Sequence, residues 1–213
     1  MLVAYKYRIY PNKEQQIYLA KTFGCARFVY NKMLADRIVH YKNTGKSLKN
    51  TPAQYKNEFP WLKEVDSLAL ANAQLNLDKA YKNFFRDKSV GFPKFKSKKT
   101  NYFSYTTNNQ KRTIYFYKNY IKIPKLKSMI RIKQHRLFDG IIKSCTVSKV
   151  PSGKYYISVL VDTADIKQLE IIDNKIGIDL GIKEFAICSD ENRFDNPKHL
   201  RKSEKELVNY PPL

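Results

Sequence analysis

The sequence has few cysteines. Only three are present, Cys25, Cys145 and Cys188; they lie far apart and include no CxxC pair. A disulfide framework needs an even set of cysteines, and a structural zinc site needs closely spaced pairs. Both are therefore excluded, so zinc is not expected in this chain. We expect three reduced, mostly buried thiols that behave as small hydrophobic side chains.

Long apolar runs are lacking as well. No stretch approaches the roughly 18 apolar residues that indicate a membrane-spanning helix. The opening, MLVAYKYRIYPNK, contains no apolar segment of the kind found in signal peptides. These absences predict a cytoplasmic protein without a membrane partner.

Acidic residues are missing from one long segment. Residues 88–136 carry 14 Lys and Arg and no Asp or Glu, within a chain whose formal net charge is +21. The final third, residues 137–213, carries 11 basic and 12 acidic residues and is close to neutral. A local surplus of this size favours a polyanionic partner, above all a nucleic acid, over a small acidic molecule.

The same basic segment interleaves its cations with nine aromatic residues. Lysines can neutralise phosphates while aromatic rings stack on unpaired bases. Alternatively, the cations form a solvated face over a barrel whose core contains the aromatic rings. We favour the core for Tyr115 and Tyr117. We assign to nucleic-acid contact Lys94, Lys96, Lys98, Lys99, Lys111 and Arg112.

Periodicity divides the first part of the chain into one strand and several helices. Alternation over residues 3–10 predicts a strand, and Asn12 with Gln15 forms a capping-box pattern that starts a helix at Lys13. Gly24 is expected to end that helix, and a second one covers roughly residues 25–41. A long helix over residues 67–86 is expected to bury Leu68, Ala71, Leu75, Tyr81, Phe84 and Phe85.

After Gly91 the pattern changes to a period of two. Residues 113–124 predict a hairpin that turns at Lys118 and Asn119, and residues 143–162 predict another that turns at residues 151–153. Regularly spaced antiparallel strands suggest a small barrel. The predicted fold class is therefore α+β, with a helical bundle inserted in an antiparallel β-barrel that the first strand joins.

Arg27 and Asn31 form a candidate pair on the predicted second helix. Residues four apart share one helix face. A guanidinium and an amide can read base edges or bind phosphates, but a buried or capping role explains the pair equally well. Both readings stay open, with nucleic-acid contact as the site assignment.

The stretch KIGIDLGIKEFAICSDE, residues 175–191, predicts a hairpin that presents Asp179 between two glycines. Ile176, Ile178 and Leu180 are expected to face a core, with Asp179 on the opposite side. Two-metal nucleases bind paired cations through several carboxylates. The other acids of the hairpin lie about 10–17 Å away along the strand, too far to share a metal with Asp179. An exposed hairpin acid without catalytic role is the competing reading.

Several blocks in order give the chain a resemblance to a known family. YKYRIYPNKEQ, GCARFVYNKML, GFPKFKSKK, IKIPKLKSMIRIKQHR and KIGIDLGIKEFAICSDE together resemble the N-terminal part of TnpB, the transposon-encoded RNA-guided DNA endonucleases. NPKHLRKSEKEL resembles the start of the helix that follows in that family. The similarity runs from residue 1 to about residue 206.

This resemblance implies an architecture, a site and partners. Asp179 matches the first catalytic aspartate of the RuvC motif, with Mg²⁺ as its metal if the site is completed. Guide RNA and DNA are the implied partners, in the nucleoid of a bacterial or archaeal cell. The implied domains are a first wedge-barrel strand (1–11), a helical recognition domain (12–88), a wedge barrel with the basic loop (89–170) and an RNase H-like RuvC segment (171–213).

The resemblance stops before the family's later catalytic acids and zinc ribbon. We therefore expect an incomplete RuvC domain, of which only the first hairpin is present, and a chain that is catalytically incomplete by itself. A separate chain that supplies the remainder is one possibility to test. The alternative function is a nuclease-dead, repressor-like protein that binds RNA or DNA through the retained modules.

Overall fold

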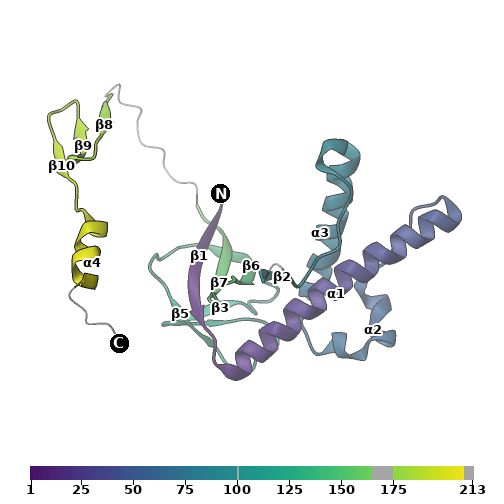
Figure 1. Ribbon diagram of the computed structural model, residues 1–213. Helices are drawn as coiled ribbons and strands as arrows, with labels where there is room; N and C mark the ends of the chain where they lie inside the picture. Colours follow the sequence, from purple (N-terminus) through teal and green to yellow (C-terminus); the bar gives the residue numbers. More distant parts are fainter. Residues whose placement is uncertain (100, 165–174, 209–213) are drawn as a thin grey trace. The chain divides into compact units, whose positions relative to one another are not determined.

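The computed structural model describes residues 1–99, 101–164 and 175–208, the last four by their backbone alone. It divides the chain into two compact units, Met1–Ile166 and Lys167–Leu213 (Figure 1). The first unit contains a sheet with inserted helices, and the second contains a small sheet with one helix.

The first unit is built around a curled, seven-stranded antiparallel sheet in the order β2-β6-β7-β1-β5-β4-β3 (Figure 1). Its strands are β1 (Leu2–Tyr10), β2 (Phe103–Asn108), β3 (Tyr115–Tyr117), β4 (Tyr120–Lys122), β5 (Ile130–Lys133), β6 (Ile141–Lys149) and β7 (Tyr155–Asp162). As predicted, the first strand joins this sheet, between β7 and β5. Strands β2 and β3 are the two edges, so the sheet is a half-barrel and not the closed barrel expected.

The alternation along β1 sorts its side chains between core and solvent. Tyr7 and Ile9 are fully buried, whereas Lys6, Arg8 and Tyr10 between and beyond them are exposed. Because successive side chains in a strand point to opposite faces, one face of β1 supplies the core and the other stays free. The prediction of a strand here is confirmed.

Helix α1 (Lys13–Thr44) is one uninterrupted helix of 32 residues. Its capping box is present as predicted, with Asn12 Oδ1 accepting from the Gln15 amide at 2.9 Å. The predicted break at Gly24 is wrong. Glycine costs only about 1 kcal/mol in a helix interior, and burial of Phe23 and Cys25 on either side offsets that cost. The helix ends at Gly45, which adopts a left-handed conformation with φ 68°.

Helix α3 (Ser67–Arg86) has the predicted bounds but buries a different face. Ala69, Leu70, Ala73 and Leu77 are buried, whereas Phe85 is 74% exposed. Helix α3 packs against α1 and β2, and this packing decides which stripe of the helix is covered. Short helices connect the longer elements: η1 (Pro52–Gln54), α2 (Tyr55–Glu58), η2 (Pro60–Lys63) and η3 (Lys88–Val90).

A polar contact fixes α3 against the sheet. Asp66 caps the N-terminus of α3 by accepting from the Leu68 amide at 3.2 Å, and its second oxygen accepts a hydrogen bond from the Thr107 hydroxyl on β2. Asp66 and Thr107 are both buried. The start of α3 is therefore tied to the strand that follows the basic loop.

The hairpins turn where the sequence predicts, but the predicted core position of Tyr115 and Tyr117 is wrong. β3 and β4 pair with Tyr117 opposite Tyr120, across Lys118 and Asn119. Tyr115 is 45% exposed and Tyr117 is 59% exposed, so neither belongs to the core. Ile121 is buried on β4 instead, and Phe116 between the two tyrosines packs against the core. The register places both tyrosines on the solvent side.

The second unit contains a three-stranded antiparallel sheet in the order β10-β9-β8 and one helix. Its elements are β8 (Ile178–Leu180), β9 (Glu184–Cys188), β10 (Arg193–Asp195) and α4 (His199–Val208). Ile176, Ile178 and Leu180 are exposed, so the expectation that they face a core is wrong for the described part of this unit. Within those residues a single sheet offers no second layer to cover them.

Two remaining expectations concern the thiols and the membrane. Cys25 and Cys145 are buried and free, and Cys188 is free and partly buried, as predicted for reduced cysteines. Burial raises the pKa of Cys25 to about 11. In the residues that the structure describes, no helix combines the length and the apolar character needed to cross a bilayer.

Candidate nucleic-acid interface

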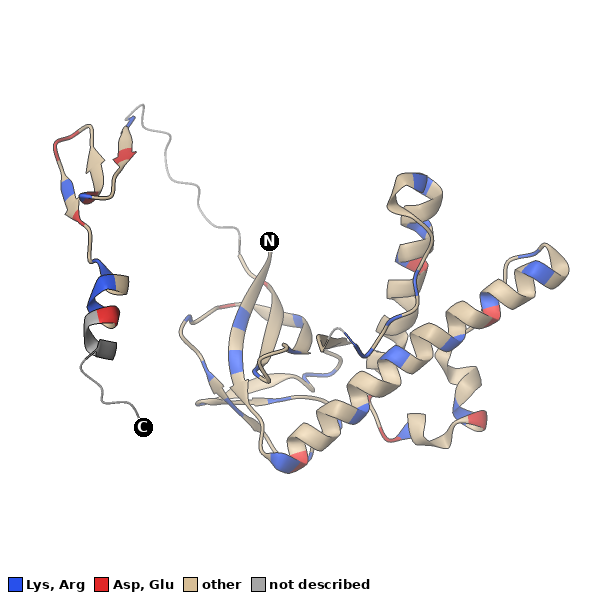
Figure 2. Cartoon of the chain, in the orientation of Figure 1, with Lys and Arg blue, Asp and Glu red and all other residues tan. Residues whose placement is uncertain are grey.

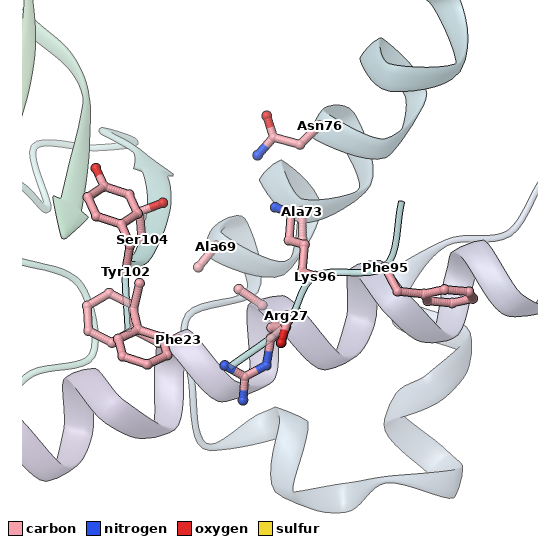
Figure 3. Close-up of a pocket in the computed structure, with 12 residues that line it drawn as sticks. Phe23, Arg27, Ala69, Ala73, Asn76, Phe95, Lys96, Tyr102 and Ser104 are labelled. Atoms are coloured by element: carbon pink, nitrogen blue, oxygen red, sulfur yellow. The ribbon is translucent and has the colours of Figure 1, made fainter. Parts of the chain in front are cut away.

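The basic loop, GFPKFKSKK at residues 91–99, passes beside a cleft between the helices and the sheet. The cleft has a volume of about 400 Å³. Its lining comes from α1, α3, the loop and the start of β2, and includes Arg27, Asn76, Lys96, Tyr102 and Ser104 (Figure 3). These residues come from four segments that are distant in the sequence. The fold brings them together to form a polar, cationic cleft.

Asn31 fastens the loop to α1. Its Nδ2 donates to the Lys96 carbonyl oxygen at 3.0 Å, and its Oδ1 accepts from the Lys96 amide at 2.8 Å. A side-chain amide that pairs with both backbone groups of one residue imitates a neighbouring strand. The Asn31 amide is therefore used in holding the loop, and its part in the interface is to position Lys96.

The four lysines of the loop differ in their surroundings. Lys96 is exposed like the other three, but its ammonium lies 4.3 Å from the centre of the Tyr30 ring, where partial desolvation lowers its pKa. Lys94, Lys98 and Lys99 are exposed, and within the described part of the chain none of them is paired with a carboxylate. These three ammonium groups are the freest cations of the loop, and they are available to phosphate oxygens.

Arg27 supplies the cleft with a guanidinium. The group lies 5.9 Å from the centre of the Phe103 ring, and the side chain is half-buried. Among the described residues no carboxylate pairs with it. A guanidinium fork held over an aromatic ring, with its donors unused, is suited to a phosphate or a base edge. Figure 3 shows Arg27 reaching from α1 and Asn76 from α3, with Lys96 between them.

Lys111 and Arg112 lie in a different place. They follow β2, whose six residues separate them from the loop by roughly 17 Å of extended chain. Both are exposed and adopt left-handed conformations, with φ 52° and 58°. The structure therefore does not bring them together with the loop lysines around the cleft.

Asp179 lies in the second unit, on the edge strand β8. It pairs with Ile187 of β9, and the backbone of Gly177 exchanges hydrogen bonds with Ser189 at 2.8 and 2.9 Å. Glu184 at the far end of β9 forms an ion pair with Arg193 at 3.3 Å. Asp190 accepts from Asn192 beyond the other end. Asp179 therefore lies on a β8–β9 hairpin, while Glu184 and Asp190 bond other residues of this unit.

A divalent metal site does not form around Asp179 in the described residues. No group of three or more His, Cys, Asp or Glu side chains gathers anywhere in that part of the chain. Magnesium needs several oxygen ligands in near-octahedral arrangement. One exposed carboxylate on an edge strand does not fit that requirement, so we derive no catalytic step through a metal from these residues.

Two relatives decide the family. Over 218 residues the chain is 30% identical to the protein named RNA-guided DNA endonuclease InsQ of Escherichia coli strain K12. The alignment covers 97% of this chain and 52% of that protein. Over 217 residues it is 32% identical to a protein of Streptomyces pristinaespiralis that is named RNA-guided DNA endonuclease. The alignment covers 96% of this chain and 52% of that protein. The chain belongs to the TnpB family. It spans about half the length of these two TnpB relatives.

This TnpB chain has two further similarities. A family model described as a helix-turn-helix domain matches residues 1–46. In the structure these residues form β1 and α1, and α1 contains no turn. A cryo-EM structure of a Cas12f1–sgRNA–target DNA complex aligns over 98% of this chain and 60% of that one, with 11% identity and a TM-score of 0.40.

Sequence reasoning missed part of the cleft of this TnpB chain. Asn76 and Ser104 line it, yet they carry no charge and stand in no recognisable spacing. Tyr102 was one of many aromatic residues in the basic segment. The partner of Asn31 is equally hidden from sequence, because Lys96 lies 65 residues further along the chain. Only the i, i+4 relation of Arg27 and Asn31 signalled that this face of α1 is special.

The clamp leads to a first prediction. Asn31→Ala removes both hydrogen bonds to Lys96, each of which contributes about 0.5–1.5 kcal/mol. We expect amide hydrogen exchange at residues 94–99 to accelerate about fivefold or more, while exchange in β6 and β7 stays unchanged. Asn72→Ala, which removes an amide of α3 that donates to the Leu68 carbonyl oxygen at 2.8 Å and to Asn108 of β2 at 3.4 Å, both away from the loop lysines, is the control. Equal protection of the loop in wild type and Asn31→Ala would show that the clamp does not order it.

Proposed function

We propose that this chain is the nucleic-acid-binding N-terminal portion of a TnpB-like RNA-guided DNA endonuclease, with guide RNA and DNA as its partners. One observation carries the proposal. The ammonium groups of Lys94, Lys98 and Lys99, which pair with no carboxylate of the described residues, stand on a loop that Asn31 holds beside the Arg27 cleft. Preorganised cations of this kind bind a phosphate backbone without an ordering cost at the moment of binding.

The chemistry of the interface assigns roles to its side chains. The lysines neutralise phosphates and set the position of the nucleic acid, which carries no sequence information in itself. Arg27 can bind one phosphate or base edge with two parallel hydrogen bonds, and Asn76 offers an amide from the facing helix. In RNA-guided recognition, base pairing reads the sequence and the protein binds the backbone. The composition of this cleft suits that division.

We propose further that the described residues bind nucleic acid and do not cut it. Asp179 remains the candidate catalytic acid, and the Mg²⁺ that the family resemblance implies would need carboxylates additional to it. The longer relatives hold their remaining length in the same chain, so nothing in the comparisons supports a separate subunit. The residues that line the cleft all lie in the first unit, and this arrangement also suits the alternative function, a nuclease-dead, repressor-like protein that uses the same interface.

Salt dependence tests the proposal. For four phosphate contacts by Lys94, Lys98, Lys99 and Arg27, log affinity should fall with log salt with a slope of about −3. We expect this slope in fluorescence anisotropy titrations of the chain with an RNA hairpin of about 30 nucleotides and a DNA duplex of about 30 base pairs, between about 50 and 200 mM KCl. A slope near zero would remove the electrostatic basis of the proposed function.

The same titrations separate binding from cutting. Asp179→Ala should leave affinity and salt slope unchanged, because Asp179 lies in the second unit and takes no part in the cleft. Adding Mg²⁺ should produce no cleavage of either probe by wild type. Cleavage that Asp179→Ala abolishes would overturn the binding-only reading and show that the metal site is completed.

A further inference from the structure

The outward side of the large sheet forms a second surface that the cleft does not include. We call it the outer sheet face and define it by the exposed or half-exposed side chains that alternate with the core. Its members on the described strands are Lys6, Arg8, Tyr10, Tyr115, Tyr117, Tyr120, Arg131, Lys133 and Tyr156. Buried neighbours such as Tyr7, Ile121 and Ile132 point to the core from the same strands, so this alternation fixes which side is outward.

The strand register aligns these side chains into rows. Tyr10 of β1 stands opposite Arg131 of β5, Arg131 stands opposite Tyr120 of β4, and Tyr120 stands opposite Tyr117 of β3. One row therefore reads Tyr, Arg, Tyr, Tyr across four neighbouring strands and spans about 14 Å. A second row places Arg8 between Tyr156 and Lys133. Directly opposed side chains lie close enough to act as one platform.

The rings of the first row are open to solvent. Tyr10 is 42% exposed, Tyr120 is 44% exposed and Tyr117 is the most exposed of the three. The guanidinium groups of Arg8 and Arg131 lie 5.0 and 5.9 Å from the centre of the Tyr10 ring. Aromatic rings left in water on a sheet, with cations beside them, cost hydrophobic free energy that a ligand can recover by covering them.

The charge of this face has one sign. Strands β1, β3, β4 and β5 contain no Asp or Glu. Asp162 at the end of β7 forms ion pairs with Lys143 at 3.0 Å and with the N-terminal ammonium at 3.6 Å. A shallow basic hollow lined by Lys6, Arg8, Lys133, His135, Val150 and Tyr156 lies within the face. Figure 2 shows the blue bands of Lys and Arg along β1 and its neighbours.

Exposed aromatic rings beside cations favour one class of polyanion over the others. A duplex presents phosphates but keeps the faces of its bases stacked inside, so exposed tyrosines would gain nothing from it. An acidic peptide offers charge but few planar groups. Unpaired nucleotides offer both a phosphate chain and free base faces, and a sheet with two or three exposed aromatic rings is suited to stack on them.

We propose that the outer sheet face binds unpaired nucleotides, with Tyr10, Tyr120 and Tyr117 stacking on bases and with Arg8, Arg131 and Lys133 contacting phosphates. This inference deepens the proposed function. It depends on the proposed function only for the class of partner, because the residues of the outer sheet face are distinct from those of the cleft. Stacking accepts any base, so binding is independent of sequence.

Matched variants of the full chain test the stacking. In the triple variant Tyr10→Leu, Tyr117→Leu and Tyr120→Leu the rings are lost but apolar bulk remains, and the variant with all three changed to Phe keeps the rings. The probes are oligouridylate, oligothymidylate and an RNA hairpin without unpaired ends. We expect the Leu variant to lose tenfold or more in affinity for both single strands and less than twofold for the hairpin stem. The Phe variant should stay within about threefold of wild type throughout.

The outcomes separate this inference from the proposed function. Wild type that binds no probe overturns both. Wild type that binds the hairpin but neither single strand, or a Leu variant that binds single strands as well as wild type, overturns the stacking inference alone. A strand preference between oligouridylate and oligothymidylate identifies the source of the unpaired nucleotides as RNA or DNA.

Crosslinking makes the test independent of variants that fold poorly. Photoactivated 4-thiouridine oligonucleotide should crosslink to wild type at peptides that contain Tyr10, Tyr117 or Tyr120, as mapped by mass spectrometry. Crosslinks confined to residues 91–104 would place the single strand in the cleft and overturn the inference.

Discussion

Replacing Lys94, Lys96, Lys98 and Lys99 together by Ala should weaken nucleic-acid binding by about 30- to 100-fold near physiological salt. Each lost phosphate contact should also flatten the slope of log affinity against log salt by about 0.7–0.9. Because Lys96 lies against Tyr30, we expect a slope change of about 2–3 and not the full value for four contacts. Anisotropy titrations with hairpin RNA and duplex DNA measure both quantities.

A charge-matched control distinguishes a site from a diffuse field. Lys13, Lys46, Lys49 and Lys154 are exposed and lie outside the cleft lining. Changing these four to Ala removes the same net charge, and we expect less than a threefold loss of affinity, about 0.6 kcal/mol. If both quadruple variants lose affinity equally, the loop is no more than part of a general positive charge (Figure 2).

The largest effect on folding is expected at Gly140. Its φ is +135°, and an added Cβ would overlap the carbonyl oxygen of Asp162 and lie 2.9 Å from Cγ1 of Val161. Gly140 precedes β6, whose first residue pairs with Asp162 of β7, so neither backbone can retreat without breaking that register. Gly140→Ala should therefore lower the free energy of unfolding by about 2–3 kcal/mol.

Urea unfolding followed by Trp61 fluorescence measures this change. The chain has one tryptophan, and it lies in the first unit, where its ring packs on Phe28 with centroids 4.9 Å apart. Gly153→Ala is the matched control: φ is +76° there, but no atom lies within 4 Å of the added Cβ. The control should cost about 1 kcal/mol from backbone strain alone. Equal costs at both positions would refute the steric argument.

Signals that act within a few residues could be predicted from the sequence. The Asn12–Gln15 capping box and the turn at Lys118 and Asn119 appear where they were predicted, because the groups that decide them are adjacent. The bounds of α3 also follow from local pattern. Assignments that depend on distant neighbours failed: Gly24 stays helical because burial on both sides outweighs its propensity.

The same limit applies to burial and to the site. The side of the sheet that Tyr115 and Tyr117 occupy depends on their pairing with β4 and on the curl of the sheet, which alternation alone does not specify. The loop lysines could be named from charge, but the Asn31 clamp that positions them could not. The domain boundaries, the site roles and the acids that would accompany Asp179 remain predictions.

The unbroken course of α1 makes the helix a lever. At 1.5 Å per residue it is about 48 Å long. Its first turns are fastened beneath the sheet, where Gln15 bonds Ser128 and Met129 at 2.9 and 3.0 Å. Near its far end Arg37 bonds Asp78 of α3 at 2.7 Å. A tilt of about 10° at the fastened end would move the other end of the helix by about 8 Å. The loop is bonded to α1 through Asn31. A ligand that displaces the loop would therefore also displace both ends of α1.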